Sequence, residues 1–490
     1  MDPSSFSNFT APTFLFLFLP VVLAACFVTP KPLRNLVLLI ASIIFYAEGE
    51  RIYTLVMVFS ILFNYAMGLA LQETEAPANR KSLLVVGIAV NLGLLATYKY
   101  AGFLVRNLNF LLDAVHLPGC PMPHLKLPIG ISFFTFHALS YITDVYRREV
   151  RAMRRFDSFA LYITLFPQLI AGPIIRYKII CNQFSDRKVT LDGFAEGVRR
   201  FVIGLGKKQL IANTVAITAD QIFQAPHTAQ LTPGVAWLGI VCYTLFIYFD
   251  FSGYSDMAIG LGRMFGFVFP ENFNYPYVAS SITDFWRRWH ITLSSWFRDY
   301  LYVPMGGNRR RPIRVYFNLL TVFFLCGLWH GATWSFVIWG LYHGVFLIFE
   351  RVGAGKWVEE KLGPFRHVYV LVVVMVGWVF FNARDLSQAI TYVSVMAGLR
   401  HGTAMEYSVA MYLNPAMVLA LAAGIIGSTP LVPWVRAAWD RAAVRAVATG
   451  SLLLDVLGRG VSLAFLAVIY VGCTMMSAHG SYSPFIYYRF

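Results

Sequence analysis

Apolar stretches recur along the whole of this chain, and they limit its fold more than any other feature. Many are long enough to cross a bilayer, which takes about 20 apolar residues in a helix. Only 13% of the 490 residues are charged, roughly half of what a soluble globular protein carries. We therefore expect an all-α polytopic membrane protein. The predicted spans are roughly 11–29, 35–48, 52–72, 83–105, 127–146, 197–224, 234–262, 315–331, 333–350, 366–383, 410–428 and 450–476.

No linker rich in Pro, Gly or Ser divides the sequence, so residues 1–490 are predicted to form a single membrane domain. Two further apolar stretches, near 157–175 and 388–398, are short or polar enough to be re-entrant or interfacial. The six cysteines are scattered and are read as small apolar fillers rather than as disulfides or metal ligands. They are Cys26, Cys120, Cys181, Cys242, Cys326 and Cys473.

Basic residues set the predicted orientation, because loops rich in Lys and Arg remain in the cytoplasm. Lys31 and Arg34 follow the first span, which places the N-terminus outside. The basic stretch at about 263–314 is then cytoplasmic, and twelve crossings return the tail 481–490 to the outside. The net charge of +15 is explained by orientation and by anionic lipid headgroups, not by nucleic acid.

Polar residues interrupt the apolar span that ends near residue 262. Asp250, Ser252, Tyr254 and Asp256 lie together in the segment YFDFSGYSDMAIG. A carboxylate at membrane depth is costly unless it is paired or lines a wet cavity, so these residues are candidates for a substrate tunnel. The alternative is that the two aspartates only cap helix ends or pair with nearby arginines.

The stretch 281–310 combines aromatic and basic residues on the predicted cytoplasmic side. We expect an amphipathic helix lying in the membrane interface, with His290 on it, either at a tunnel mouth or as an ordinary interfacial histidine. The arginines suit the phosphates of a coenzyme A or phosphopantetheine donor, although anchoring at the cytoplasmic face also explains them. The candidate substrate residues here are Trp286, Trp289, Arg298, Asp299 and Asn308.

His330 is the strongest single candidate for a functional group. It lies sixteen residues after Arg314, so a helix carries it about 24 Å from the loop at ~1.5 Å per residue. An ionisable group at that depth marks a functional site by default, and burial favours a neutral imidazole that can accept a proton. Flanking Gly327 and Gly331 allow close approach of backbone or ligand. The alternative is a histidine that hydrogen-bonds between helices as structural glue; His343 is predicted to be structural.

Several motifs occur together in the chain. WRRWH at 286–290 precedes GLWHG at 327–331, and the histidines of the two motifs are forty residues apart. The combination resembles the membrane-bound O-acyltransferase family, and specifically its bacterial polysaccharide branch. The resemblance runs from FLFLFLP at 14–20 to the C-terminal tail. The other motifs that carry it are YFDFSGYSDMAIG, ENFNYPY, RDYLYVPMGGN and FPQLIAGP.

This resemblance implies a helical bundle with a catalytic tunnel between the cytoplasmic and outer faces. The near-invariant family histidine falls on His330 and a second, more variable one on His290. A C-terminal F-x-Y-x-x-F motif is implied to carry a tyrosine that receives the acyl group. Phe485, Tyr487 and Phe490 match that motif, so Tyr487 is the implied acyl relay.

The implied reaction moves an acetyl or similar short acyl group from a cytoplasmic thioester across the inner membrane, for O-acetylation of an exported polysaccharide such as alginate. The donor is acetyl-CoA or an acyl carrier, and no bound cofactor or metal is expected. The other implied partners are membrane lipids, a periplasmic esterase-fold acetyltransferase and the polysaccharide synthesis and export complex. Both termini are expected on the periplasmic side.

The residue types suit this chemistry, because a hydroxyl is a poor nucleophile until a base removes its proton. His330 is the predicted base, and His290, Asn272 or a tryptophan N–H is predicted to stabilise the oxyanion. Asn272 and Trp329 are further tunnel candidates. Three alternatives stay open: a lipid or protein O-acyltransferase with a long-chain donor, a transporter in which His330 relays protons, and a scaffold for a polysaccharide synthase.

Overall fold

The computed structural model describes residues 8–225, 228, 231–400, 408–448 and 453–478, and within them every regular element is a helix. The all-α fold class is confirmed. The α-helices are α1 (Leu19–Val28), α2 (Arg34–Glu50), α3 (Thr54–Glu73), α4 (Pro77–Ala114), α5 (Ile131–Tyr146), α6 (Phe156–Thr164), α7 (Phe166–Leu169), α8 (Tyr177–Ile180), α9 (Gln183–Asp186), α10 (Leu191–Gly206), α11 (Asn213–Phe223), α12 (Pro233–Met264), α13 (Ile282–Arg288), α14 (Ile291–Phe297), α15 (Pro312–His330), α16 (Trp334–Phe349), α17 (Gly355–Leu362), α18 (Arg366–Asn382), α19 (Leu386–Met396), α20 (Pro415–Gly427), α21 (Leu431–Ala448) and α22 (Leu453–Ala478).

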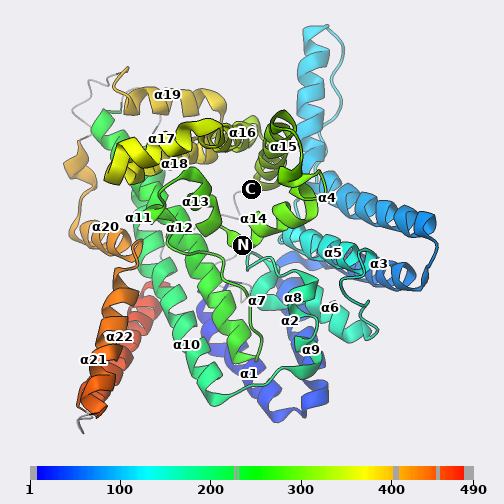
Figure 1. The fold of residues 1–490 in the computed structure, drawn as a ribbon, viewed down its shortest axis with the longest axis horizontal. Coiled ribbons are helices and arrows are strands. Elements are labelled where there is room, and N and C mark those ends of the chain that lie inside the picture. The colour runs from blue at the N-terminus through cyan, green and yellow to red at the C-terminus, as the bar shows by residue number, and fades with distance from the viewer. Residues whose placement is uncertain (1–7, 226–227, 229–230, 401–407, 449–452, 479–490) are drawn as a thin grey trace.

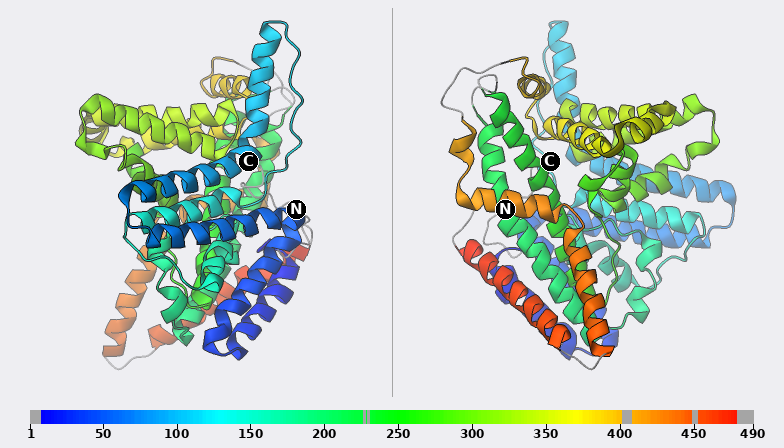
Figure 2. Two further views of the ribbon diagram at one scale, coloured as in Figure 1. Left: turned by 90° about the vertical axis from the view of Figure 1, so that its right-hand side faces the viewer. Right: turned by 60° about the vertical axis from the view of Figure 1, so that its left-hand side comes forward.

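Helix α12 is the central element of the bundle. It packs against α7, α10, α11, α18, α19 and α20, and most of its residues are buried. Thr232 caps its first turn by accepting a hydrogen bond from the Val235 N–H, and Pro233 occupies the first helical position, where a missing N–H costs nothing. Helices α10 and α12 run side by side, and the α21–α22 pair lies at one edge of the molecule (Figures 1 and 2).

Two pairs of glycines let α10 and α12 approach closely. A Cβ on Gly204 would lie 2.6 Å from the Gly253 carbonyl oxygen, and a Cβ on Gly197 would lie 2.6 Å from that of Gly260. Each pair is seven residues from the other on its helix, so both lie on one helix face. Small residues at such positions are typical of helix pairs that associate inside a membrane.

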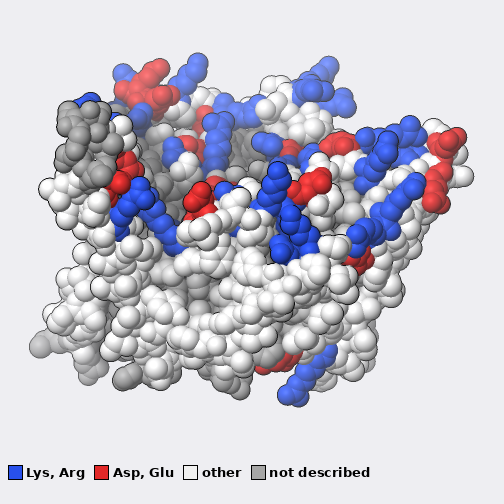
Figure 3. Space-filling model, turned by 90° about the horizontal axis from the view of Figure 1, so that it is seen from below, with Lys and Arg blue, Asp and Glu red and all other residues white. Residues whose placement is uncertain are grey.

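The apolar helices fit a membrane protein. Six helical stretches in the described residues are long and apolar enough to cross a bilayer, or seven if the bent pair α20–α21 counts as one span. Two of the six, Lys31–Glu73 and Trp334–Asn382, contain more than one helix, so the predicted total of about twelve spans stays a prediction. Figure 3 shows Lys and Arg side chains gathered along one side of the molecule, next to a broad band without charge.

The prediction of one amphipathic helix over 281–310 is wrong. The segment breaks into α13, α14, a π-helical turn at Arg298–Tyr302 and a 3-10 turn at Gly307–Arg309. Its tryptophans do not lie at an interface, since Trp286, Trp289 and Trp296 are all buried in the core. The chain turns sharply at His290, between α13 and α14, and that turn positions the candidate site.

Candidate functional site

His330 is the last residue of α15, where the helix stops inside the bundle. Its side chain is only 6% exposed. The imidazole lies edge-on between aromatic rings, with centroid distances of 4.9 Å to Trp329, 5.0 Å to Trp339 and 5.3 Å to Phe381. Its Nδ1 is enclosed and has no hydrogen-bond partner in the part of the chain that the structure describes. This environment holds a neutral imidazole in a fixed orientation.

The glycines on either side of His330 allow close approach of the backbone of α16, as the sequence predicted. A Cβ on Gly327 would lie 2.3 Å from the Phe336 carbonyl oxygen, and a Cβ on Gly331 would lie 2.1 Å from the Phe336 ring. Gly331 is extended, and α16 begins three residues later. The glycines therefore allow α15 and α16 to pack backbone to backbone and fix where His330 stands.

His290 is held in an unusual backbone conformation. Its φ of 44° and ψ of 53° lie in the left-handed region, which is uncommon for a residue other than glycine and costs about 1–3 kcal/mol. The side chain is fully buried, with its ring 4.7 Å from that of Phe251 on α12. Backbone strain maintained by surrounding contacts is common at functional sites.

Asn272 provides those contacts. Its backbone oxygen accepts a hydrogen bond from the Ile291 N–H at 2.9 Å. Its side-chain Oδ1 accepts from the Thr292 N–H at 3.3 Å and from the Thr292 hydroxyl at 2.8 Å. The amide Nδ2 donates to the Ser255 hydroxyl at 3.0 Å. Asn272 thus clamps the start of α14 to α12.

The same clamp sets the tautomer of His290. The backbone N–H of Thr292 can only donate, so the atom it meets on Asn272 is the oxygen. His290 Nδ1 lies 3.1 Å from that oxygen and must therefore carry the proton. His290 Nε2 is then an acceptor; it is buried and unpartnered within the described residues. This geometry does not favour the prediction that Asn272 or a neutral His290 stabilises an oxyanion by donating a hydrogen bond.

Trp329 connects the two histidines. Its ring centroid lies 6.1 Å from that of His290 and 4.9 Å from that of His330. The two histidines, Asn272 and Trp329 are therefore brought together from α15 and from the segments on either side of α13.

A cavity of about 360 Å³ borders this cluster. His330 and Trp329 line it, together with Lys99 from α4 and Ser132 from α5. The segment 126–131 forms another wall. Lys126 in that wall is 61% exposed, so the cavity reaches the protein surface. Gly130, with φ of 76° and a Cβ position only 2.6 Å from the Leu169 carbonyl oxygen, accepts no larger residue without strain.

The aspartates of α12 are paired with basic residues of the α10–α11 region. Asp250 forms a fully buried ion pair with Lys208. Asp256 contacts Arg200 at 2.6 Å and Lys207 at 2.7 Å. These contacts agree with the pairing alternative, although two of the three partners are lysines. Ser252 and Tyr254 are buried beside them, with Tyr254 stacked at 4.7 Å on Phe9.

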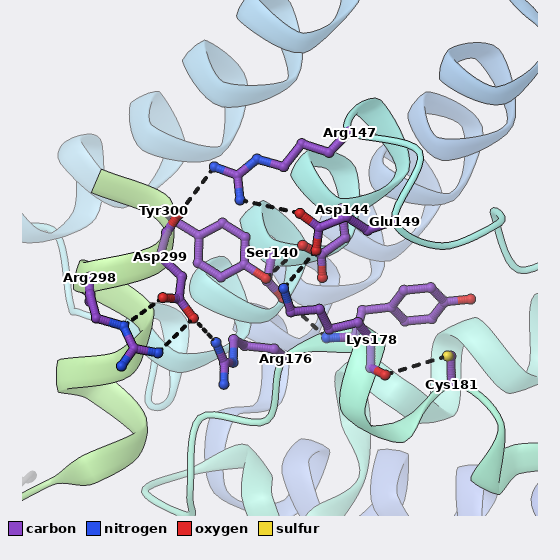
Figure 4. A network of polar contacts seen from close by, with 11 residues as sticks. Ser140, Asp144, Arg147, Glu149, Arg176, Lys178, Cys181, Arg298, Asp299 and Tyr300 are labelled. Carbon is purple, nitrogen blue, oxygen red and sulfur yellow. Dashed lines mark hydrogen bonds and ion pairs between the residues drawn. The ribbon is translucent and has the colours of Figure 1, made fainter. Parts of the chain in front are cut away.

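Arg298 and Asp299 belong to a separate polar network (Figure 4). Asp299 accepts hydrogen bonds from Arg298 at 2.7 Å and from Arg176, while the Asp299 carbonyl accepts one from Arg147 at 3.1 Å. Burial raises the pKa of Asp299, but the hydrogen bonds and positive charges of Arg298 and Arg176 outweigh it and lower the pKa below its usual range. Arg298 remains 62% exposed, so it is accessible to a ligand.

The remaining candidates are dispersed. Trp286 packs 5.1 Å from His343 and Trp289 packs 4.9 Å from Trp378, both in the aromatic core. Asn308 accepts a hydrogen bond from Tyr302 at 2.7 Å near the surface. Tyr487, with Phe485 and Phe490, lies outside the described residues.

Sequence reasoning missed Lys99. It lies inside the predicted span 83–105, and an ionisable residue there is itself a signal of function. The structure places it on the cavity wall beside His330. His137 was also missed: its Nε2 accepts a hydrogen bond from the Ile175 N–H at 3.2 Å, which is a structural role.

Two buried histidines, one with a fixed tautomer and one lining a cavity, thus lie close together inside a bundle of apolar helices. The sequence profile of the "MBOAT, membrane-bound O-acyltransferase family" matches residues 129–382. The chain belongs to the membrane-bound O-acyltransferase family and is a multi-pass membrane enzyme that transfers acyl groups to oxygen. The alternatives of a transporter without chemistry and of a scaffold therefore no longer apply.

Curated relatives match between about half and nearly all of the chain. A Pseudomonas putida protein named "Probable alginate O-acetylase AlgI" is 40% identical over 489 residues, covering 98% of this chain and 100% of the relative. The peptidoglycan O-acetyltransferase of Helicobacter pylori is 37% identical over 426 residues, 80% of each chain. The teichoic acid D-alanyltransferase of Bacillus subtilis is 31% identical over 278 residues, covering 52% of this chain and 68% of the relative.

Proposed function

We propose that this enzyme moves acetyl groups from a cytoplasmic thioester donor across the inner membrane for O-acetylation of an exported polysaccharide such as alginate. The relatives support this assignment, because all three are named for acyl transfer to a cell-surface or exported polymer. The two with the higher identity are named for acetyl transfer, which favours acetyl over D-alanyl.

His330 carries the proposal. It is buried at the end of α15, borders the cavity, and lies beside a second histidine whose ring nitrogen is free to accept. In the proposed reaction, His330 removes the proton from an acceptor hydroxyl, and the resulting oxygen attacks the thioester carbonyl. A base of this kind contributes about 10²–10⁴-fold to the rate. We assign His290 a supporting role on the other side of Trp329, where the thioester donor is proposed to bind.

We assign the first acceptor to Tyr487. The support is the match of Phe485, Tyr487 and Phe490 to the family's C-terminal motif. A periplasmic esterase-fold acetyltransferase then passes the acetyl group to the polymer within the synthesis and export complex. A Tyr487→Phe variant tests this step, because normal polymer acetylation by that variant would show that the group leaves by another route.

On the cytoplasmic side, we assign donor binding to the exposed guanidinium of Arg298. The donor is acetyl-CoA or an acyl carrier, whose phosphates an arginine binds well. Both termini are proposed to face the periplasm, with the charged network of Figure 4 facing the cytoplasm.

A His330→Ala variant tests the proposed function. We expect it to insert and fold but to lose polymer acetylation by about 10²–10⁴-fold. His343→Ala is the matched control, since His343 is as deeply buried, on the adjacent helix α16, but is not among the residues that line the cavity. Normal acetylation by His330→Ala would exclude the mechanism. Competition by palmitoyl-CoA stronger than by acetyl-CoA would instead indicate a long-chain lipid or protein acyltransferase.

A further inference from the structure

The partly buried side chain of Lys99 lies beside the proposed base. Its Nζ donates hydrogen bonds to the carbonyl oxygens of Trp329 and His330, the latter at 3.3 Å, and lies 3.4 Å from the Ser132 hydroxyl. The same group lies 5.7 Å from the centre of the Trp329 ring and lines the cavity together with His330.

The charge of Lys99 has no acidic partner among the described residues. No carboxylate in the described ranges lies within ion-pair distance of Lys99. The carboxylate of Glu50 pairs with Lys126 at 3.6 Å near the cavity mouth. Lys99 is partly buried and lines the cavity, so water that enters the cavity can solvate its ammonium. Its charge is therefore available to negative charge that arrives or develops in the cavity.

Capping of α15 does not by itself require a cation. A cation stabilises the carbonyl end of a helix, and Lys99 does bond the carbonyls of its last two residues. However, the Leu328 carbonyl, one position earlier, is bonded by the neutral Tyr100 hydroxyl at 2.9 Å. The neutral hydroxyl of Tyr100, the residue after Lys99 in α4, is therefore sufficient to cap the Leu328 carbonyl. The positive charge of Lys99 is additional to what capping needs.

We propose that Lys99 is a catalytic residue that stabilises the negative charge developing on the acceptor oxygen. The inference rests on the proposed function. Lys99 lines the wall of the cavity that reaches the surface near Lys126, so it meets the acceptor and not the thioester donor.

The step balances with Lys99 retaining its protons throughout. The acceptor O–H loses its proton to His330 while its oxygen forms a bond to the thioester carbonyl carbon. The carbonyl π electrons move onto its oxygen and return as the carbon–sulfur bond breaks. The thiolate then takes the proton from His330. The ammonium of Lys99 lowers the energy of the state in which the acceptor oxygen is partly negative.

The test uses the purified full-length protein with acetyl-CoA as donor and a series of phenols of graded acidity as acceptors: 4-methoxyphenol, phenol and 4-chlorophenol. The variants are Lys99→Gln, which can still donate to the carbonyls without charge, and Lys99→Arg, which keeps the charge. Tyr100→Phe is the matched control, because it removes the neighbouring neutral cap.

We expect Lys99→Gln to lower the transfer rate by about 10²–10³-fold, the effect of losing one oxyanion-stabilising group. The loss should be largest for the least acidic phenol, because that acceptor develops its charge least easily. Lys99→Arg should recover much of the rate, and Tyr100→Phe should leave the dependence on phenol acidity unchanged.

A wild-type rate in Lys99→Gln would overturn the inference while leaving the proposed function intact. An equal loss for all phenols, accompanied by a lower melting temperature, would also overturn it and assign Lys99 to helix capping. Absence of transfer by the wild-type protein would instead count against the proposed function, and this inference would fall with it.

Discussion

At the scale of single residues, Asn272 determines which nitrogen of His290 can act as a base. The Oδ1 of Asn272 receives the His290 Nδ1–H, so Nε2 is free to accept. Burial lowers the pKa of His290 to about 3. His290 is therefore neutral over the range of about pH 5 to 8 in which histidines usually titrate, and the wild-type enzyme should show no loss of activity there from its protonation.

Asn272→Asp should change that pH dependence. A carboxylate next to Nδ1 stabilises the charged imidazolium and raises the pKa of His290. Activity that needs neutral His290 should then fall as the pH decreases through the raised pKa, and it should be retained above it. The measurement is the rate of acetyl transfer across the pH range. Ser255→Ala, which removes only the Asn272 Nδ2 partner, should keep the wild-type profile; an unshifted profile in Asn272→Asp would contradict the assigned tautomer.

At the scale of elements, the packing of α15 on α16 holds His330 in place. Gly327→Ala would put a methyl group 2.3 Å from the Phe336 carbonyl oxygen, so the two helices must separate. We expect a loss of about 1–3 kcal/mol in stability, with reduced activity because His330 moves with the end of α15. Gly102→Ala in α4 is the control, since nothing lies within 4 Å of its Cβ position. Equal melting temperatures for both variants would contradict this account.

The polar network around Asp299 joins the π-helical turn at Arg298–Tyr302 to Arg176 and Arg147 (Figure 4). The pKa of Asp299 is lowered, so its stabilising effect is fully present above the unfolded pKa of about 3.9 and is lost as the pH falls through the lower folded value. Asp299→Asn should reduce the melting temperature at pH 7, and the difference from wild type should shrink in strong acid. A difference that grows in acid would contradict the ion-pair role.

The sequence predicted elements better than it predicted the site. The break at GLWHG and the end of α15 at His330 follow from apolar length and glycine spacing, which are local. The left-handed turn at His290 does not, because it depends on Asn272, eighteen residues away, and no local pattern encodes that contact. Lys99 meets His330 only through the packing of α4 on the end of α15, 231 residues apart in sequence. Local patterns predict one helix over 281–310, and they miss the long-range contacts that break it.

At the scale of the whole molecule, the asymmetric distribution of charge sets the orientation in the membrane. Basic side chains gather on one side of the uncharged band (Figure 3). By the rule that basic loops stay inside, we expect this side to face the cytoplasm. In the proposed orientation the cavity wall at 126–131 faces the periplasm, and an acceptor would reach His330 from outside while the donor arrives from within.

Two natural cysteines allow this orientation to be tested. Cys120 is exposed in the loop between α4 and α5, and Cys181 is partly exposed in the loop region after α8. In variants that keep only one of them, a membrane-impermeant maleimide applied to intact spheroplasts should label Cys120 and not Cys181. Arg310→Cys, at an exposed position in the basic stretch, is the matched inner control and should react only after permeabilisation. Labelling of Cys181 or Arg310→Cys in intact spheroplasts would reverse the orientation, and donor and acceptor would have to exchange their routes to His330.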